Sequence, residues 1–523
     1  MSGPTSTGPE PQAAREPAAP PSMARIVVRG VSLAGIGYVL TQGITLVSYL
    51  VLARLIEPRD FGHFTAAILI AGLGTLIGDT GMAAAVVQRQ NGGEEVPNTA
   101  FVSTLASGAI MMILALGAAP LLGLFFHSHE VELIAAVMSG WLLLRMVEIV
   151  PQALLQRRLS FVRRMIVDPL AAVAYLVVAV IAGASGLGAW ALVLATYAGA
   201  VVSAALAWTL ARWRPRPRLA SKRTWRELAR FGRPVVVGDL IQRGVEETPV
   251  AGIGRFIGAG ALGQYTYALR VATQPLGLIV NGIAYVLLPS FARLAPDRRR
   301  LRAAVQRALR GVCSLAFPAG LIFVPLGVPA MTVVFGAKWH QAGYALMALS
   351  VSCGALSIAA LATEIWKATG RVGFLPRMHG LALGLTVALV AAALPLGVVG
   401  VCGAMSLASL GVAAYALWGM HVVIDIRVRA LASEVWAPAI AAAVMAAGLY
   451  AIDRVIIHAG AHTVPLDLVL LAAEALLGVA IYLSALRLIA PGTTAELAGL
   501  VRPLLPRFQL KAARAPLAGE QGR

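Results

Sequence analysis

Charged residues are scarce in this sequence. Asp, Glu, Lys and Arg make up 13% of the 523 residues, whereas a soluble domain carries roughly 25%. No charged residue occurs in segments 99–126, 169–211, 311–337 and 380–424. Because a helix needs about 20 apolar residues to cross ~30 Å of hydrocarbon, the longest of these segments hold two crossings each. The scarcity of charge therefore predicts an all-α polytopic membrane protein.

Cysteines and catalytic motifs are also scarce. The three cysteines, Cys313, Cys353 and Cys402, lie far apart in apolar stretches, which excludes a disulfide framework and a cysteine metal site. No nucleophile elbow, Walker loop or HExxH motif occurs, so ATP hydrolysis and protease chemistry have no support. We therefore expect a transporter rather than an enzyme, with no cofactor and no metal.

About fourteen transmembrane helices account for the apolar segments. An even number of crossings places both termini on the same side of the membrane. The predicted cores of the crossings are 31–53, 61–87, 99–124, 131–153, 166–184, 187–210, 234–254, 262–288, 311–335, 341–366, 379–396, 399–424, 435–457 and 466–489.

The basic residues fall almost entirely on one side of these crossings. If the N-terminus is cytoplasmic, 35 of the 43 Lys and Arg residues lie in cytoplasmic segments or at their edges. The positive-inside rule then predicts a multi-pass protein of the plasma membrane with both termini cytoplasmic. It also explains the net charge of +19 without a nucleic-acid partner. Anionic membrane lipids are the expected partners of the basic loops.

An internal repeat divides the crossings into two halves. RLIEPRDFGHFT at 54–65 aligns with RFIGAGALGQYT at 255–266, at a constant offset of 201 residues. Six crossings separate the two copies, so the halves have the same orientation and form a parallel repeat. The predicted organisation is a disordered cytoplasmic tail (1–25), a six-helix bundle (26–211), a basic cytoplasmic linker (212–232), a second six-helix bundle (233–424), an appended helix pair (425–490) and a cytoplasmic tail (491–523).

Ionisable residues inside crossings are functional candidates by default, because a charge in hydrocarbon is costly. One interpretation is a polar lumen whose arginines bind phosphate or pyrophosphate through their forked donors. The other is that the charges only neutralise each other locally, and both stay open for Arg145 and Arg243. Arg270 has no acidic residue within one helical turn, which favours function. The substrate-binding candidates are Arg145, Arg243, Arg270, Gln274 and Asn281, and the candidate ion-coupling or lumen acids are Asp79, Asp239, Glu246 and Glu247.

The segments IGRFIG at 253–258 and ALGQYTYALR at 261–270 form a distinctive pair of motifs. They resemble segments of the Wzx-like polysaccharide flippases of the MOP exporter superfamily, and they carry the most specific part of this resemblance. VLLPSFARL at 286–294 and VFGAKW at 334–339 are also similar to family segments. The family often carries an Asn-x-Asp pattern before the first segment, whereas this sequence has Glu-Thr-Pro at 247–249.

The resemblance implies a V-shaped bundle that works by alternating access. The implied substrate is an undecaprenyl-pyrophosphate-linked oligosaccharide used in cell-surface polysaccharide biosynthesis, with glycosyltransferases and a polymerase of the same pathway as further partners. An ion-coupled drug or metabolite antiporter of similar architecture is the first alternative. A membrane glycosyltransferase or polymerase is the second, and the short predicted outside loops argue against it.

Overall fold

The computed structural model describes residues 23–79, 81–88, 93–157, 161–454 and 464–494, and all regular elements in these ranges are helical. The first 22 residues and residues 495–523 of the two predicted tails lie outside the described part. The main helices are α1 Met23–Leu55, α2 Pro58–Asp79, α3 Met82–Gln88, α4 Glu95–Phe126, α5 His129–Arg157, α6 Phe161–Ala184, α7 Ala189–Ala211, α8 Lys222–Phe256, α9 Ala259–Leu294, α10 Arg298–Leu321, α11 Phe323–Pro329, α12 His340–Leu349, α13 Ser352–Ala368, α14 Phe374–Ala393, α15 Gly397–Ile424, α16 Val428–Ile452 and α17 Val464–Ile489.

Each of the fourteen predicted crossings corresponds to a helix or to a chain of short helices, which confirms the predicted fold class. Crossing two is broken into α2 and α3, with Gly81 in a left-handed conformation (φ 72°) between them. Crossing nine continues from α10 through α11 and the π-helical turn Ala330–Phe335. Crossing ten is bent by 48° between α12 and α13.

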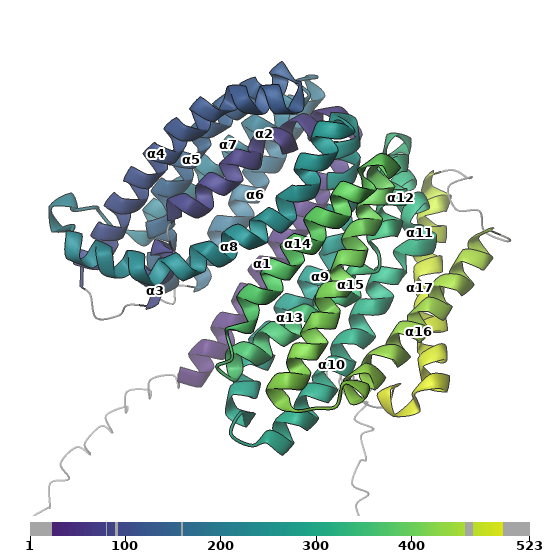
Figure 1. Cartoon of the computed structure of the whole chain (residues 1–523). Coiled ribbons are helices and arrows are strands. Elements are labelled where there is room, and N and C mark those ends of the chain that lie inside the picture. The colour runs from purple at the N-terminus through teal and green to yellow at the C-terminus, as the bar shows by residue number, and fades with distance from the viewer. Residues whose placement is uncertain (1–22, 80, 89–92, 158–160, 455–463, 495–523) are drawn as a thin grey trace, which may run out of the picture.

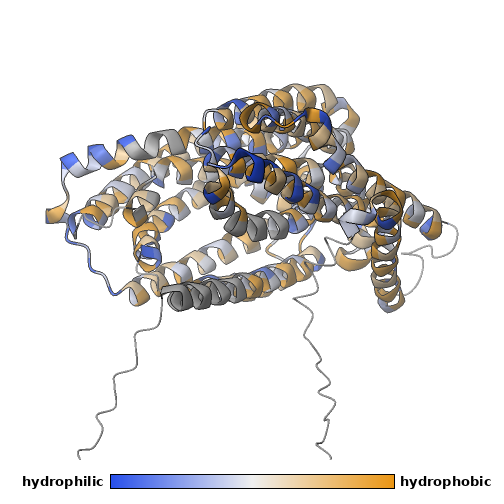
Figure 2. Cartoon of the chain, turned by 90° about the horizontal axis from the view of Figure 1, so that it is seen from below, coloured by the Kyte–Doolittle hydropathy of each residue, from blue (hydrophilic) through white to orange (hydrophobic). Residues whose placement is uncertain are grey.

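Most of these helices are apolar enough to span a bilayer alone. Within the described residues, nine helical segments meet this criterion, and the bent α12–α13 pair makes ten. One of the nine, Phe374–Ile424, has 51 residues. At 1.5 Å per residue it is far too long for one crossing, and it holds both α14 and α15. Hydrophobic residues accordingly predominate along the helices in Figure 2.

The helices form two groups that meet at one end (Figure 1). In the first half, α4 packs on α5, while α6 packs on α7 and α1. In the second half, α13 and α14 pack on α15, and the appended α16 and α17 pack beside α10 and each other. The predicted basic linker contains the short helix Pro217–Leu219 and the first turns of α8, whose N-terminus is capped by the Ser221 side chain.

The contact of α2 with α9 joins the halves through reciprocal pairs. A Cβ atom on Gly62 would stand 1.8 Å from the carbonyl oxygen of Ala259, and one on Gly263 would stand 1.8 Å from that of Pro58. Only glycine permits this backbone approach. The 201-residue offset relates Pro58 to Ala259 and Gly62 to Gly263, so each half makes the same contact on the other. The pseudo-two-fold arrangement is the one expected of the predicted parallel repeat.

Candidate functional site

A cavity of about 1100 Å³, here called the central cavity, lies between the two halves. From the first half, α1, α2, α5, α6 and α7 contribute side chains to its wall. From the second half, α8, α9 and α12–α15 complete the wall. Most of this wall is apolar, so its few charged groups largely determine which ligands the cavity binds.

Four of the predicted site residues line the central cavity: Arg243, Glu246, Glu247 and Arg270. Arg145, Gln274, Asp79 and Asp239 are not part of its lining. The side chain of Asn281 lies outside the described residues. The structure therefore divides the candidates into a group on α8, a single arginine on α9 and a set of residues away from the cavity.

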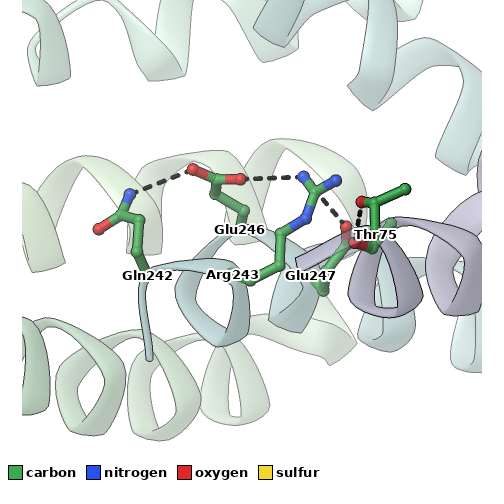
Figure 3. Close-up of polar contacts among 6 residues, drawn as sticks. Thr75, Gln242, Arg243, Glu246 and Glu247 are labelled. Atoms are coloured by element: carbon green, nitrogen blue, oxygen red, sulfur yellow. Dashed lines mark hydrogen bonds and ion pairs between the residues drawn. The ribbon is translucent and has the colours of Figure 1, made fainter. Parts of the chain in front are cut away.

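The α8 group is a local ion-pair cluster (Figure 3). Arg243 Nη1 lies 3.1 Å from Glu246 Oε2 and 3.4 Å from Glu247 Oε1. Gln242 donates a hydrogen bond of 3.2 Å to Glu246. Successive spacings of three and four residues put these side chains on one helical face, as the sequence predicted. With two carboxylates for one guanidinium, the cluster has an excess of negative charge when both acids are ionised.

Gly72 on α2 makes room for the guanidinium of this cluster. A Cβ atom at Gly72 would lie 2.6 Å from Nη2 of Arg243. One turn further along α2, Thr75 turns its hydroxyl back to the Gly72 carbonyl over 2.7 Å. The arginine from the second half thus reaches the backbone of the first half across the cavity.

Arg270 is held by aromatic rings instead of carboxylates. Its Cζ lies 4.9 Å from the ring centre of Tyr49, 6.0 Å from that of Phe61 and 5.8 Å from that of Tyr267. The ring of Tyr267 packs edge-on against those of Phe61 and Tyr49, with ring centres 4.7 and 6.4 Å apart. The Tyr267 hydroxyl also donates to the main-chain carbonyl of Tyr49 over 3.1 Å. No acidic side chain pairs with Arg270 among the described residues. Its positive charge is therefore available to a ligand in the cavity.

The remaining candidates have local partners. Arg145 forms an ion pair with the buried Glu148. Asp79 accepts the backbone N–H of Ala83 over 3.1 Å, so it caps the start of α3. These contacts support the interpretation that Arg145 and Asp79 are structural charges of the first half.

Gln274 and Asp239 are placed differently. Gln274 accepts a 3.2 Å hydrogen bond from Gln42 on α1, which links the halves. Asp239 is exposed on α8.

The aromatic residues Tyr49 and Phe61 were missed by sequence reasoning, because they come from α1 and α2, about 200 residues before Arg270.

The halves are also fastened at the end where α2 and α9 begin. Arg54 donates to the carbonyls of Val333 and Val334 over 2.7 and 3.0 Å. Its repeat partner Arg255 donates to the Phe125 carbonyl over 2.8 Å. Each repeat arginine thus reaches across to the other half, beside the Gly62 and Gly263 contacts.

An aromatic side chain and a lysine add to this fastening. Trp339 Nε1–H donates to the Ala53 carbonyl over 2.9 Å, and Lys338 lies 3.2 Å from the Glu57 carboxylate. We call all these contacts, from the glycines to Lys338, the α2/α9 seal. They join the halves beside Thr65 and Thr266, which line the central cavity.

Comparison with known proteins identifies the family. Residues 51–343 match the family model described as polysaccharide biosynthesis protein. The succinoglycan biosynthesis transport protein ExoT of Rhizobium meliloti is 28% identical over 64% of this chain and 67% of its own length. The lipopolysaccharide biosynthesis protein WzxC of Escherichia coli is 25% identical over 61% of this chain and 65% of its own length. The chain thus spans about two thirds of the length of these relatives.

Two solved structures show the same fold. The lipid II flippase MurJ in an inward closed conformation matches with a TM-score of 0.71 at 13% identity, over 90% of this chain and 99% of that one. A multidrug resistance MATE family transporter of the MOP superfamily, in an inward-facing conformation, matches with a TM-score of 0.58 at 17% identity, over 75% of this chain and 96% of that one. This multi-pass membrane protein belongs to the polysaccharide biosynthesis protein family and has the fold of the MOP superfamily transporters.

Proposed function

We propose that this protein is a flippase that moves an undecaprenyl-pyrophosphate-linked oligosaccharide from the cytoplasmic to the outer leaflet of the plasma membrane. The observation that carries the proposal is Arg270, an arginine without an acidic partner in the described structure, on the wall of a large cavity lined by both halves. A pyrophosphate supplies the counter-charge and accepts the forked donors of a guanidinium. The relatives in polysaccharide biosynthesis support a glycan as cargo.

The cavity suits the polar part of such a substrate. Drug-sized ligands occupy pockets of roughly 300–1,000 Å³, and the central cavity, at about 1100 Å³, exceeds that range. The sugars and pyrophosphate would cross inside it while the prenyl tail stays in the bilayer. Transport then requires no covalent chemistry, and we expect no enzymatic activity.

The α2/α9 seal supports alternating access as the mechanism. In the predicted topology this end of the molecule faces outside. The structure then corresponds to a state closed to the outside, and the cargo would leave only after the reciprocal contacts between α2 and α9 have opened. Rocking one half against the other about the cavity would open one end while it closes the other.

The excess carboxylate in the α8 cluster favours a second candidate function, ion-coupled export of small cations. Glu246 and Glu247 both line the cavity beside Arg243. A protonated carboxylate pair would release its protons to water as a cation binds in their place. Purified protein in liposomes distinguishes the candidates. A flippase moves a labelled lipid-linked oligosaccharide, whereas an antiporter moves a cationic dye in exchange for protons or sodium ions that flow down their gradient.

Deletion of the protein should trap lipid-linked oligosaccharide in the cytoplasmic leaflet. The expected result is loss of the exported glycan and accumulation of the intermediate, restored by the gene on a plasmid. Labelling of the intermediate in intact and in permeabilised cells measures on which leaflet it lies. Normal export by a deletion strain that has no second flippase would refute the proposed function.

A cysteine-labelling experiment tests the proposed orientation, with both termini cytoplasmic. Arg218 is exposed in the basic segment before α8, so an Arg218→Cys residue should react with a membrane-impermeant maleimide only after permeabilisation. Ser185, exposed in the predicted outside turn between α6 and α7, provides the matched variant Ser185→Cys, which should react in intact cells. The reverse pattern would invert the topology and, with it, the side on which the α2/α9 seal lies.

A further inference from the structure

Three possible metal ligands meet beside the α2/α9 seal. Asp60 and His63 lie on the first turns of α2, and Glu130 lies on the first turn of α5. One ligand atom from each of the three side chains lies within 4.8 Å of the other two. This group is outside the central cavity, and the flippase mechanism does not use it.

The imidazole of His63 is the unusual member. The residue is 3% exposed, and its Nδ1 atom lies 2.7 Å from Glu130 Oε2. Nevertheless Nδ1 has no aligned hydrogen-bond partner among the described residues. A buried polar atom without an aligned partner costs about 1–3 kcal/mol, and an ion bound by this nitrogen and by the Glu130 carboxylate would remove that cost.

At the equivalent position of the other half, the buried side chain has hydrogen-bond partners. The repeat offset of 201 relates His63 to Gln264, which is also buried. Gln264 donates to the Lys338 carbonyl over 2.6 Å and accepts the backbone N–H of Ala342 over 2.8 Å. The counterpart of Asp60 is Ala261. The first half therefore has a histidine and a nearby acid where the second half has a glutamine bonded to backbone and an alanine.

Apart from the contact of Glu130 with His63, the two carboxylates have no basic partner in the described residues. Neither Asp60 nor Glu130 forms an ion pair with an arginine or lysine in the described part of the chain. Asp60 lies against Gly188 at the start of α7, where helix N–H groups favour negative charge. A neutral imidazole with two ionised carboxylates has the net charge that suits a divalent cation.

We propose that Asp60, His63 and Glu130 bind a divalent first-row transition metal ion. One imidazole nitrogen with two carboxylate oxygens is a donor set that suits Zn²⁺ or Mn²⁺ better than Ca²⁺ or Mg²⁺, which prefer oxygen alone. Water would complete the coordination. An entry path exists, because the Glu130 side chain is 38% exposed and His63 lines a small pocket between the loops of the two halves.

The bound ion would tie the start of α2 to the start of α5. His63 directly follows Gly62, whose backbone contacts Ala259 of the second half. Fixing α2 at this point holds Gly62 in the position that the reciprocal contact needs. The site therefore strengthens the first half's side of the seal without touching the cargo.

Zn²⁺ titrated into the full-length protein tests the proposal. The protein is purified in detergent with a histidine-free tag and treated with a chelator, which is then removed. We expect one equivalent of Zn²⁺ to bind and to raise the melting temperature. His63→Asn and Glu130→Gln should each weaken Zn²⁺ binding by at least about tenfold. The two substituted residues lie on different helices. His129→Asn is the matched control, since His129 lies 3.0 Å from Glu132 on the same α5 but is 75% exposed.

The outcomes separate a metal site from a simple His–Glu ion pair. Wild-type protein that binds no Zn²⁺, or whose melting temperature does not respond to it, overturns the proposal whatever the variants do. Equal Zn²⁺ affinity of wild type, His63→Asn and Glu130→Gln also overturns it. Loss of binding in His129→Asn would assign the ion to the exposed pair instead. Binding that His129→Asn retains and the other two variants lose supports the site.

Discussion

Replacement of Arg270 by alanine should reduce glycan export at least about tenfold while the protein still reaches the membrane. Hydrogen bonds to charged groups contribute about 1.5–3 kcal/mol each, and the variant loses those that the guanidinium makes with a pyrophosphate. The folded protein loses little, because Arg270 contacts aromatic rings and no ion-pair partner among the described residues. An unpaired arginine in a membrane interior costs about 2.5–3.5 kcal/mol on insertion scales, so alanine should fold at least as well. Export of labelled glycan, normalised to protein in the membrane, is the measurement.

Two further variants make this experiment specific. Arg270→Lys should recover only part of the export, since an ammonium lacks the planar fork and stacks poorly on Tyr49. Arg454→Ala is the matched control: Arg454 also lies over an aromatic ring, that of Tyr450 at 5.4 Å, but on the appended helix pair. It should export normally. Full export by a normally expressed Arg270→Ala protein would remove Arg270 from the substrate path.

Cross-linking position 65 to position 266 should stop export completely and reversibly. The hydroxyl oxygens of Thr65 and Thr266 lie 3.5 Å apart, one from each half. Cysteines at both positions can therefore form a disulfide across α2 and α9, which would prevent the seal from opening. Alternating access requires that opening, so oxidation should abolish export and a reductant should restore it. The native cysteines Cys313, Cys353 and Cys402 are free and buried, and the experiment uses a background that lacks them.

The single variants Thr65→Cys and Thr266→Cys are the controls for the cross-link. Each removes one hydroxyl but cannot bridge the halves, so each should export equally well under oxidising and reducing conditions. A double-cysteine protein that is fully cross-linked, as judged by gel mobility after cleavage between the halves, and that still exports glycan would contradict a mechanism in which this end opens.

The sequence predicts the helices well because lipid imposes a simple constraint on them. A run of apolar residues such as 169–211 must cross the membrane, and Gly183 to Gly186 must turn the chain between crossings. The α8 cluster was also predictable, because Arg243, Glu246 and Glu247 are close in sequence and one helical face brings them together. In both cases the information is local.

The partner of Gln274 and two of the three rings around Arg270 are distant in sequence, so the sequence could not supply them. Gln274 is bonded to Gln42, 232 positions away, and the Tyr49 and Phe61 rings beside Arg270 come from α1 and α2. Asp79 was a candidate for ion coupling. Its contact with Ala83 depends on the break between α2 and α3, and the sequence predicted a single unbroken crossing there. The way the helices pack determines these contacts, and no spacing of residues in a single sequence reveals that packing.

The reciprocal contact of α2 and α9 is also the contact that two copies of a single six-helix unit would make with each other. A surface on which Pro58 meets Gly263 while Ala259 meets Gly62 is self-complementary, as in a two-fold homodimer. Each half of this polypeptide therefore carries one copy of this contact surface. The connection through 212–232 adds contacts of its own, since the Arg216 side chain pairs with Glu94 on α4. What distinguishes the halves is what each has placed around that shared surface: an imidazole and two acids on one side, and a glutamine bonded to backbone on the other.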